Sequence, residues 1–243
     1  MSKTTALILI GLFIFGLACS DNPVSTSTIN GSQNLITVNR EIPNFSAIKN
    51  RLVANINIQL GPEQEVSLTV DDNIADYIVL SVASSGELVI RTDPGIDLSN
   101  YDLTLNLTVT NLISIRQLGT GQITSALSLN VEDLDIELEG AGTINLDLEA
   151  ENVNTTIEGA GSITLCGSAE THTCNHTGAA VLHAFDLVTM ETVISLCGVG
   201  YAEVYASEML EIDFGGVCSL YYRGNPEIVQ TGSGVGSIVD SNP

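Results

Sequence analysis

Carboxylates are the most numerous charged groups in this 243-residue sequence, with 29 Asp and Glu against 7 Lys and Arg. Six of them alternate with apolar residues and have the outward parity within their own repeat: Asp135, Glu137, Glu139, Asp147, Glu149 and Glu158. If strands stack in register, these carboxylates could lie about 5 Å apart and coordinate Ca²⁺. The chain has no EF-hand loop and no GGxGxD repeat. We therefore interpret the acidic ladder as a solvated face and leave Ca²⁺ binding open.

The spacing His172-x-Cys174-x-His176 could also hold a metal, because alternate residues of a strand face the same side. When the repeats are aligned by their glycines, however, His176 falls opposite Ile157, which has the apolar parity. We therefore expect a buried histidine here, and we predict no metal and no cofactor.

Four cysteines follow the N-terminal region, and their pairing stays open. The alternation gives Cys174 and Cys218 the inward parity, and Cys166 and Cys197 the outward parity. Disulfides are possible in an exported protein, and Cys166–Cys174 across one corner is the best-placed pair. We favour the alternative, in which all four are free and pack as small hydrophobic residues.

The sequence offers little for catalysis. From Leu112 onward the only basic residues besides histidine are Arg116 and Arg223, and no G-x-S-x-G nucleophile motif occurs. The carboxylates occupy regular strand positions rather than an irregular insertion. We predict that the protein is not an enzyme; a hydrolase that uses two carboxylates is the enzymatic alternative.

β-Structure must position these groups, because apolar and polar residues alternate with a period of two and no 3.6-residue pattern is present. A Gly-x-Gly element recurs about every 20 residues, with a degenerate copy at Gly178-Ala-Ala180. A constant period favours a β-solenoid over a meander. The glycines that we expect at its turns are Gly119, Gly121, Gly140, Gly142, Gly159, Gly161, Gly198 and Gly200.

The chain divides into four parts. Residues 1–18 have the pattern of a lipoprotein signal peptide, with Cys19 as the lipidation site. Residues 19–34 are small and polar and predict a flexible tether. Residues 35–110 predict a less regular β section, formed by the first coils or by a unit that caps one end, and residues 111–243 predict the solenoid.

The formal net charge of −22 argues against nucleic acid as a partner. Three tyrosines of outward parity near the C-terminus, Tyr201, Tyr205 and Tyr221, are possible contacts for a glycan or protein ligand. The alternative is that they are ordinary exposed strand residues. The oligomeric state is not predicted.

Several landmarks occur in order around the Gly-x-Gly ladder: Phe45-Ser-Ala-Ile48, Gly61, Gly86-Glu-Leu88-Val-Ile90, Tyr222-Arg-Gly-Asn-Pro226 and Gly232-Ser-Gly234. With the lipoprotein signal, they resemble the putative auto-transporter adhesin, head GIN domain family of Bacteroidota over roughly Asn39 to Val239. The resemblance implies a right-handed β-helix-like solenoid and transfers no catalytic residue.

Together, the residues and the resemblance predict an exported, lipid-anchored, non-catalytic binding module, adhesin-like, at the bacterial cell envelope. It would be attached to the outer membrane, with the folded part either periplasmic or surface-exposed. The alternatives are a periplasmic envelope or signalling accessory that binds another protein, and a carbohydrate-active enzyme.

Overall fold

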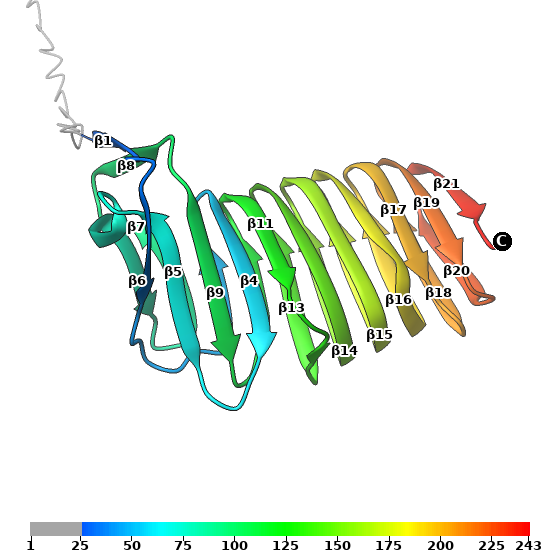
Figure 1. Cartoon of the computed structure of the whole chain (residues 1–243). Coiled ribbons are helices and arrows are strands. Elements are labelled where there is room, and N and C mark those ends of the chain that lie inside the picture. Colours follow the sequence, from blue (N-terminus) through cyan, green and yellow to red (C-terminus); the bar gives the residue numbers. More distant parts are fainter. Residues whose placement is uncertain (1–25) are drawn as a thin grey trace, which may run out of the picture.

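The computed structural model describes residues 26–243, which form a β-solenoid of about 7 turns (Figure 1). The predicted all-β, right-handed β-helix-like fold is confirmed. The signal peptide and the lipidation site Cys19 lie outside the described residues. Within residues 26–243, no helix is long and apolar enough to cross a membrane.

One side of the solenoid, nearest the viewer in Figure 1, is called the front sheet. Its strands lie in the order β2 (Leu35–Asn39), β5 (Glu65–Asp71), β9 (Leu103–Val109), β4 (Ala54–Leu60), β11 (Thr120–Ser125), the first halves of β14 (Ala141–Ile157), β15 (Ala160–His176) and β16 (Ala179–Leu196), then β17 (Val199–Tyr205), β19 (Val217–Arg223) and β21 (Val235–Asp240).

The opposite side is called the rear sheet. Its order is β6 (Ile78–Val82), β7 (Glu87–Thr92), β3 (Ala47–Asn50), β10 (Ser114–Gln117), β13 (Asp133–Leu138), the second halves of β14, β15 and β16, then β18 (Met209–Phe214) and β20 (Glu227–Gly232). The remaining elements are β1 (Ser27–Asn30), β8 (Ile96–Ser99), β12 (Leu129–Asn130) and the 3₁₀ turn η1 (Ala75–Tyr77).

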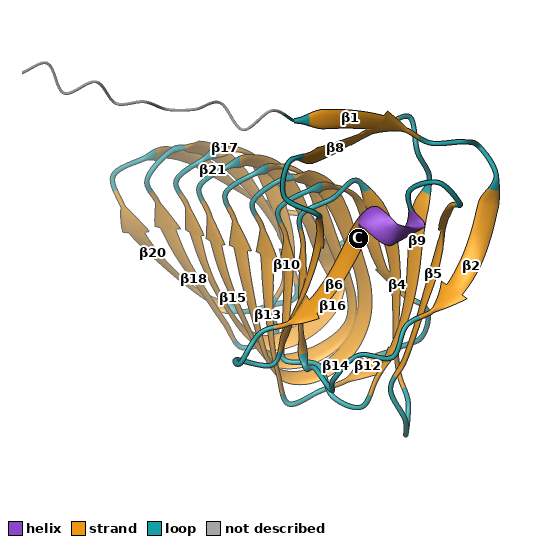
Figure 2. Cartoon of the chain, turned by 90° about the vertical axis from the view of Figure 1, so that its left-hand side faces the viewer, coloured by secondary structure: helices purple, strands orange, loops and turns teal. Residues whose placement is uncertain are grey.

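From β10 onward the coils stack in parallel register, so that equivalent residues of successive repeats lie directly opposite one another (Figure 2). The first glycine of each Gly-x-Gly element lies at the corner between the two sheets. A Cβ added to Gly159 would be 2.1 Å from the carbonyl oxygen of Gly140 in the preceding coil. Gly161 has a φ of +147°, which L side chains rarely adopt. The corner therefore needs glycine for close stacking of backbone on backbone.

The core is a set of apolar columns that run along the solenoid. In one column Ile123, Ile144, Ile163 and Leu182 lie in register and are fully buried. Burial of such a side chain contributes roughly 1.5–3 kcal/mol. In β14 the buried parity shifts between Leu148 and Val153, which marks a second corner within the strand.

The N-terminal section both continues the solenoid and caps it, so the two readings of residues 35–110 are combined. β3 and β4 pair in parallel with β10 and β11, and therefore form a regular coil. β4 lies between β9 and β11, so strand order departs from chain order here. Beyond them, β2, β5 and β6 pair antiparallel and cover the end of the stack.

The expected polar tether differs from the structure over its last residues. Ser27–Asn30 forms strand β1, which pairs with β8. The next residues are held by carboxylates: the Ser32 hydroxyl donates to Asp72 at 2.6 Å, and the Asn34 amide donates to the same carboxylate at 2.7 Å. A small polar segment can therefore be ordered by side-chain acceptors without any apolar pattern.

The C-terminal end is open by comparison. β20 pairs with β18 alone and β21 with β19 alone among the described strands, so one edge of each is unpaired. Phe214, 1% exposed, fills the core below this last coil, and its ring would be 2.3 Å from a Cβ on Gly236. The large ring therefore closes the apolar interior, while the backbone edge remains accessible.

Candidate binding surface

The six carboxylates of the acidic ladder face outward, but they do not form one stacked column. In register, Asp135 lies opposite Asn154 and Asp147 lies opposite Cys166. Carboxylate and amide contact each other instead, as where Asn154 donates to Asp135 at 3.0 Å. Among residues 26–243, no group of three or more His, Cys, Asp or Glu side chains could hold a metal ion. At these two positions, the arrangement separates like charges that a stacked carboxylate ladder would bring together.

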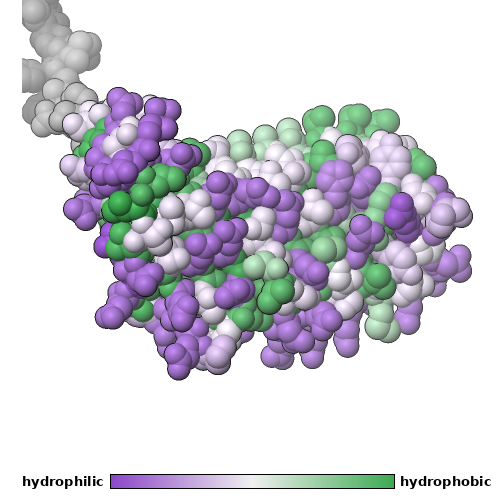
Figure 3. Space-filling model, in the orientation of Figure 1, coloured by the Kyte–Doolittle hydropathy of each residue, from purple (hydrophilic) through white to green (hydrophobic). Residues whose placement is uncertain are grey.

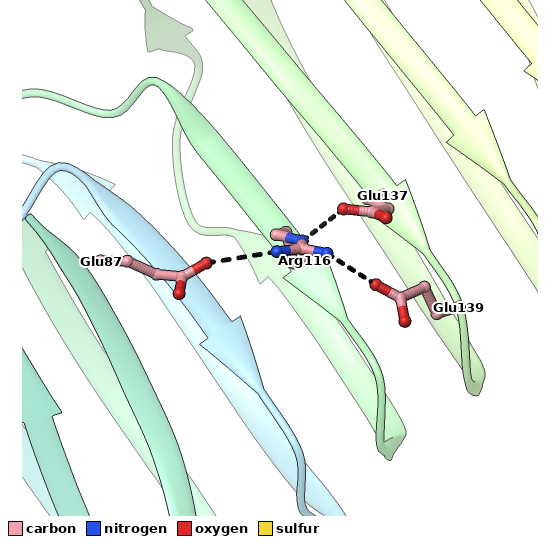
Figure 4. A network of polar contacts seen from close by, with 4 residues as sticks. All are labelled: Glu87, Arg116, Glu137 and Glu139. Atoms are coloured by element: carbon pink, nitrogen blue, oxygen red, sulfur yellow. Dashed lines mark hydrogen bonds and ion pairs between the residues drawn. The ribbon is translucent and has the colours of Figure 1, made fainter. Parts of the chain in front are cut away.

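The rear sheet carries one ion-pair network, centred on Arg116 (Figure 4). Its guanidinium hydrogen-bonds Glu137 through Nε and Glu139 through Nη2 at 2.9 Å, and Nη1 lies 3.7 Å from Glu87. The hydrogen bond to Glu137 raises the pKa of Arg116. The network links β7, β10 and β13, with β3 lying between β7 and β10. Because all four side chains are partly exposed, it contributes modestly to stability.

His172, Cys174 and His176 all point into the core. His172 is 1% exposed, and its Nε2 is 3.1 Å from the Thr155 hydroxyl. Burial lowers the pKa of His172 to about 4 and raises the pKa of Cys174 to about 12. His176 Nε2 is 2.9 Å from the carbonyl oxygen of Ala180. These side chains are therefore interior packing residues with local hydrogen bonds.

The four cysteines of the described chain are free. Cys174 and Cys218 are buried, whereas Cys166 is half-buried and Cys197 is exposed, in line with their alternating parity. Burial raises the pKa of both Cys166 and Cys218, so these thiols are less reactive than an exposed thiol.

Two of the three predicted tyrosines come together on the front sheet. The rings of Tyr201 and Tyr221 are edge to face, with centroids 5.9 Å apart, and Tyr201 makes a similar contact with His183 at 5.7 Å. His183 Nδ1 lies 2.6 Å from a carboxylate oxygen of Glu203. We call His183, Tyr201, Glu203 and Tyr221 the aromatic cluster. It is half-buried and outward-facing, so a ligand could reach it.

Tyr205 lies beside this cluster rather than within it. It is in register with Arg223, and the guanidinium of Arg223 is 4.2 Å from the centroid of the Phe185 ring. Phe185 sits where β16 has one more residue than β15 between paired positions, which is a β-bulge. Phe185 and Arg223 were not predicted as possible ligand contacts, because only register across coils shows that they meet.

The front sheet also carries two rows of uncharged polar side chains, which the sequence analysis missed. They cross seven strands from β2 to β15, and we call them the polar rows. The first row consists of Thr37, Thr69, Thr104, Asn55, Gln122, Thr143 and Ser162, and the second of Asn39, Ser67, Asn106, Asn57, Thr124, Asn145 and Thr164. The signal was present after each corner, as in Gly142-Thr-Ile-Asn145 and Gly161-Ser-Ile-Thr164.

Two further features border the polar rows. Along the corner, an apolar ridge contributes one exposed residue per coil, and Figure 3 shows apolar atoms gathered along this upper edge. The ridge consists of Ala141, Ala160, Ala179, Val199, Val217 and Val235, and the three valines are 68%, 69% and 76% exposed.

At the N-terminal end, a hollow of about 640 Å³ is lined by both polar and charged side chains, among them Asn106, Gln59, Arg40 and Glu65.

Comparison with known proteins agrees with this architecture. The sequence profile of the family described as "Putative auto-transporter adhesin, head GIN domain" matches residues 44–226. A solved structure of a putative adhesin from Bacteroides fragilis is 26% identical, with a TM-score of 0.82 over 88% of this chain and 100% of that chain. No curated protein matches.

Two more distant solved structures share the fold. One is a putative lipid binding protein from Parabacteroides distasonis, 21% identical, with a TM-score of 0.72 over 88% of this chain and 100% of that one. The other is a putative adhesin from Parabacteroides merdae, 18% identical, with a TM-score of 0.67 over 88% and 99%. With its profile match over most of the solenoid, the chain belongs to the family of the putative auto-transporter adhesin, head GIN domain.

Proposed function

We propose that the protein is an exported, lipid-anchored and non-catalytic module that binds a ligand at the bacterial cell envelope through its front sheet. The observation that carries this proposal is the aromatic cluster, in which Tyr201 and Tyr221 pack edge to face on an outward surface. Aromatic side chains that also carry a polar group are enriched where proteins contact ligands. The adhesin-like character of the family supports a binding role.

The position of the cluster fits an anchored protein. The first described strand, β1, lies at the capped end of the solenoid, whereas the cluster lies on β16, β17 and β19 toward the other end (Figure 1). Acyl chains on Cys19 would fix the capped end to a membrane, and two or more chains give stable attachment. The solenoid would then hold the aromatic cluster away from the lipid surface.

The cellular side of the membrane is tested by protease treatment of intact cells that carry the full-length protein, with lysed cells as the control. Loss of the protein from intact cells supports surface display. Protection in intact cells followed by digestion after lysis would instead support the periplasmic alternative, in which the exposed valines of the apolar ridge contact a protein partner.

The role of the cluster is tested with the triple variant Tyr201→Ala/Tyr205→Ala/Tyr221→Ala in an adhesion and glycan-array assay. We expect loss of binding. The matched control is Val193→Ala/Val229→Ala, which removes exposed apolar side chains from the rear sheet. Unchanged binding by the tyrosine variant would remove the cluster from the proposal.

A further inference from the structure

We propose that the polar rows of the front sheet bind a neutral polysaccharide chain that lies across the strands. The inference rests on the proposed binding function and names the class of ligand. Three observations carry it: the absence of charge from the two rows, their preorganised hydrogen-bonding groups, and their continuation into the aromatic cluster.

The absence of charge is selective in a chain with 29 acidic residues. From Thr37 and Asn39 on β2 to Ser162 and Thr164 on β15, both rows contain only Thr, Ser, Asn and Gln. The same coils carry Asp133, Asp135 and Glu137 on the rear sheet. A charged surface disfavours ligands of like charge and costs desolvation against neutral ones. The two polar rows therefore suit a ligand that is polar and uncharged.

The side chains of the rows hold one another in place. The Thr124 hydroxyl donates to Asn57 Oδ1 at 2.9 Å, and Asn57 Nδ2 donates to Asn106 Oδ1 at 2.8 Å. Asn106 Nδ2 in turn is 3.3 Å from the Ser67 hydroxyl. An amide has two N–H donors and an oxygen with two lone pairs. Asn57 and Asn106 therefore keep hydrogen-bonding capacity for a ligand. Because the amides are already oriented, less entropy is lost when a ligand binds.

The periodicity of the rows suits a repeating ligand. Successive strands of a sheet lie about 4.8 Å apart, so equivalent polar groups recur at a spacing comparable to the length of one sugar ring. Sugar hydroxyls both donate and accept, as do the Thr, Ser, Asn and Gln side chains that face them.

The rows continue directly into the aromatic cluster. Ser162 lies opposite Val181, which lies opposite Tyr201, and Thr164 lies opposite His183. A polysaccharide that follows the rows would therefore reach rings on which a sugar can stack. A protein partner would be expected to need apolar contact area, which the rows lack and the apolar ridge supplies.

The test is affinity electrophoresis of the full-length, detergent-solubilised protein through gels that contain a soluble neutral β-glucan, a neutral mannan or, as the charged comparison, polygalacturonate. The variant Asn145→Asp places one carboxylate in the second row, where its in-register neighbours are Thr124 and Thr164. The matched control, Asn175→Asp, makes the same change on the rear sheet between Thr156 and Ser195.

We expect a neutral polysaccharide to retard the wild-type protein and the Asn175→Asp control equally, and Asn145→Asp to bind about tenfold more weakly. Polygalacturonate should cause no retardation. The inference is overturned if neither neutral polysaccharide retards the protein, or if Asn145→Asp binds as well as the control. If cell adhesion persists and depends on the tyrosines while both neutral polysaccharides fail, the proposed function stands and this inference alone falls.

Discussion

The front and rear sheets are built from the same coils, yet they meet the same physical problem in different ways. Stacking in register places equivalent side chains one strand spacing apart. A charged residue that recurs at the same position of successive coils therefore lies next to a like charge. The rear sheet places Asn opposite Asp, as between Asn152 and Asp133 at 2.7 Å. The polar rows of the front sheet exclude charge altogether. On the rear sheet, amides therefore separate these carboxylates, whereas the two polar rows of the front sheet stay uncharged and free for contact.

The largest effect is expected at the corner that both sheets share. Gly159→Ala would bring a Cβ within 2.1 Å of the Gly140 carbonyl oxygen, so the backbone of two coils must separate. We expect the free energy of unfolding in urea to fall by more than about 3 kcal/mol. Hydrogen exchange should show lost protection in both sheets. Ala160→Ser, at the exposed neighbour, should change stability by less than about 0.5 kcal/mol; equal losses would contradict the stacking argument.

Acid should lower the free energy of unfolding through the buried side chains of the rear sheet. His172 and His176 point into the core from the second half of β15. The pKa of His172 is lowered to about 4 when folded, from 6.5. As pH falls through this window the unfolded chain binds the proton first, so stability present above pH 6.5 is lost toward pH 4, by up to about 3 kcal/mol.

The measurement is the free energy of unfolding between pH 7 and pH 4, compared with His172→Val/Thr155→Val, which removes both hydrogen-bonding partners. The variant should lose less stability on acidification, although burial also lowers the pKa of His176. Parallel pH curves for the two proteins would show that His172 does not titrate as its burial requires.

Replacing amides by carboxylates on the rear sheet should place like charges in register where the wild-type chain pairs Asn with Asp. Asn152→Asp/Asn154→Asp would place carboxylates against Asp133 and Asp135, in place of amides that donate at 2.7 and 3.0 Å. We expect a loss of about 1–2 kcal/mol in thermal or urea unfolding at low salt, partly restored by Ca²⁺. Asn175→Asp, which faces hydroxyls, serves as the control. A double variant as stable as this control would show that like charges are tolerated in register.

The smallest effect concerns the ion pairs of the rear sheet. Arg116→Gln removes contacts to Glu137 and Glu139, and we expect the unfolding free energy to fall by about 0.5–1 kcal/mol, less in about 1 M NaCl. Lys49→Gln is the matched change on the adjacent strand β3, because Lys49 lies in register with Arg116. If both variants respond alike to salt, the effect is one of net charge rather than of this network.

Much of the regular solenoid could be predicted from the sequence, because the alternation of apolar and polar residues within each repeat indicates which side chains face the core. Alternation around Ile144 and Ile163 fixes which side is buried, and the glycine period fixes which residues of successive coils meet. The insertion of β4 between β9 and β11 could not be predicted in this way, since its partners lie far away in the chain. The order of the N-terminal section depends on tertiary pairing rather than on a local pattern.

The candidate surface was predicted only in part. Outward parity identified Tyr201 and Tyr221, but the contact with His183 depends on the register of three strands. The polar rows escaped notice because Thr and Asn in a strand look unremarkable one repeat at a time. Their meaning comes from stacking, which also explains why an acidic ladder drawn from parity alone was not found.

The unpaired edge of the last coil gives the molecule a direction along which its length could change. Because β20 and β21 pair only with the coil before them among the strands of residues 26–243, an additional repeat of about 20 residues could be appended by gene duplication without disturbing the cap at the other end. Each added repeat would extend both faces by one strand. The number of repeats would thus set both the length of the solenoid and the number of contacts that its front sheet could make with a repeating ligand.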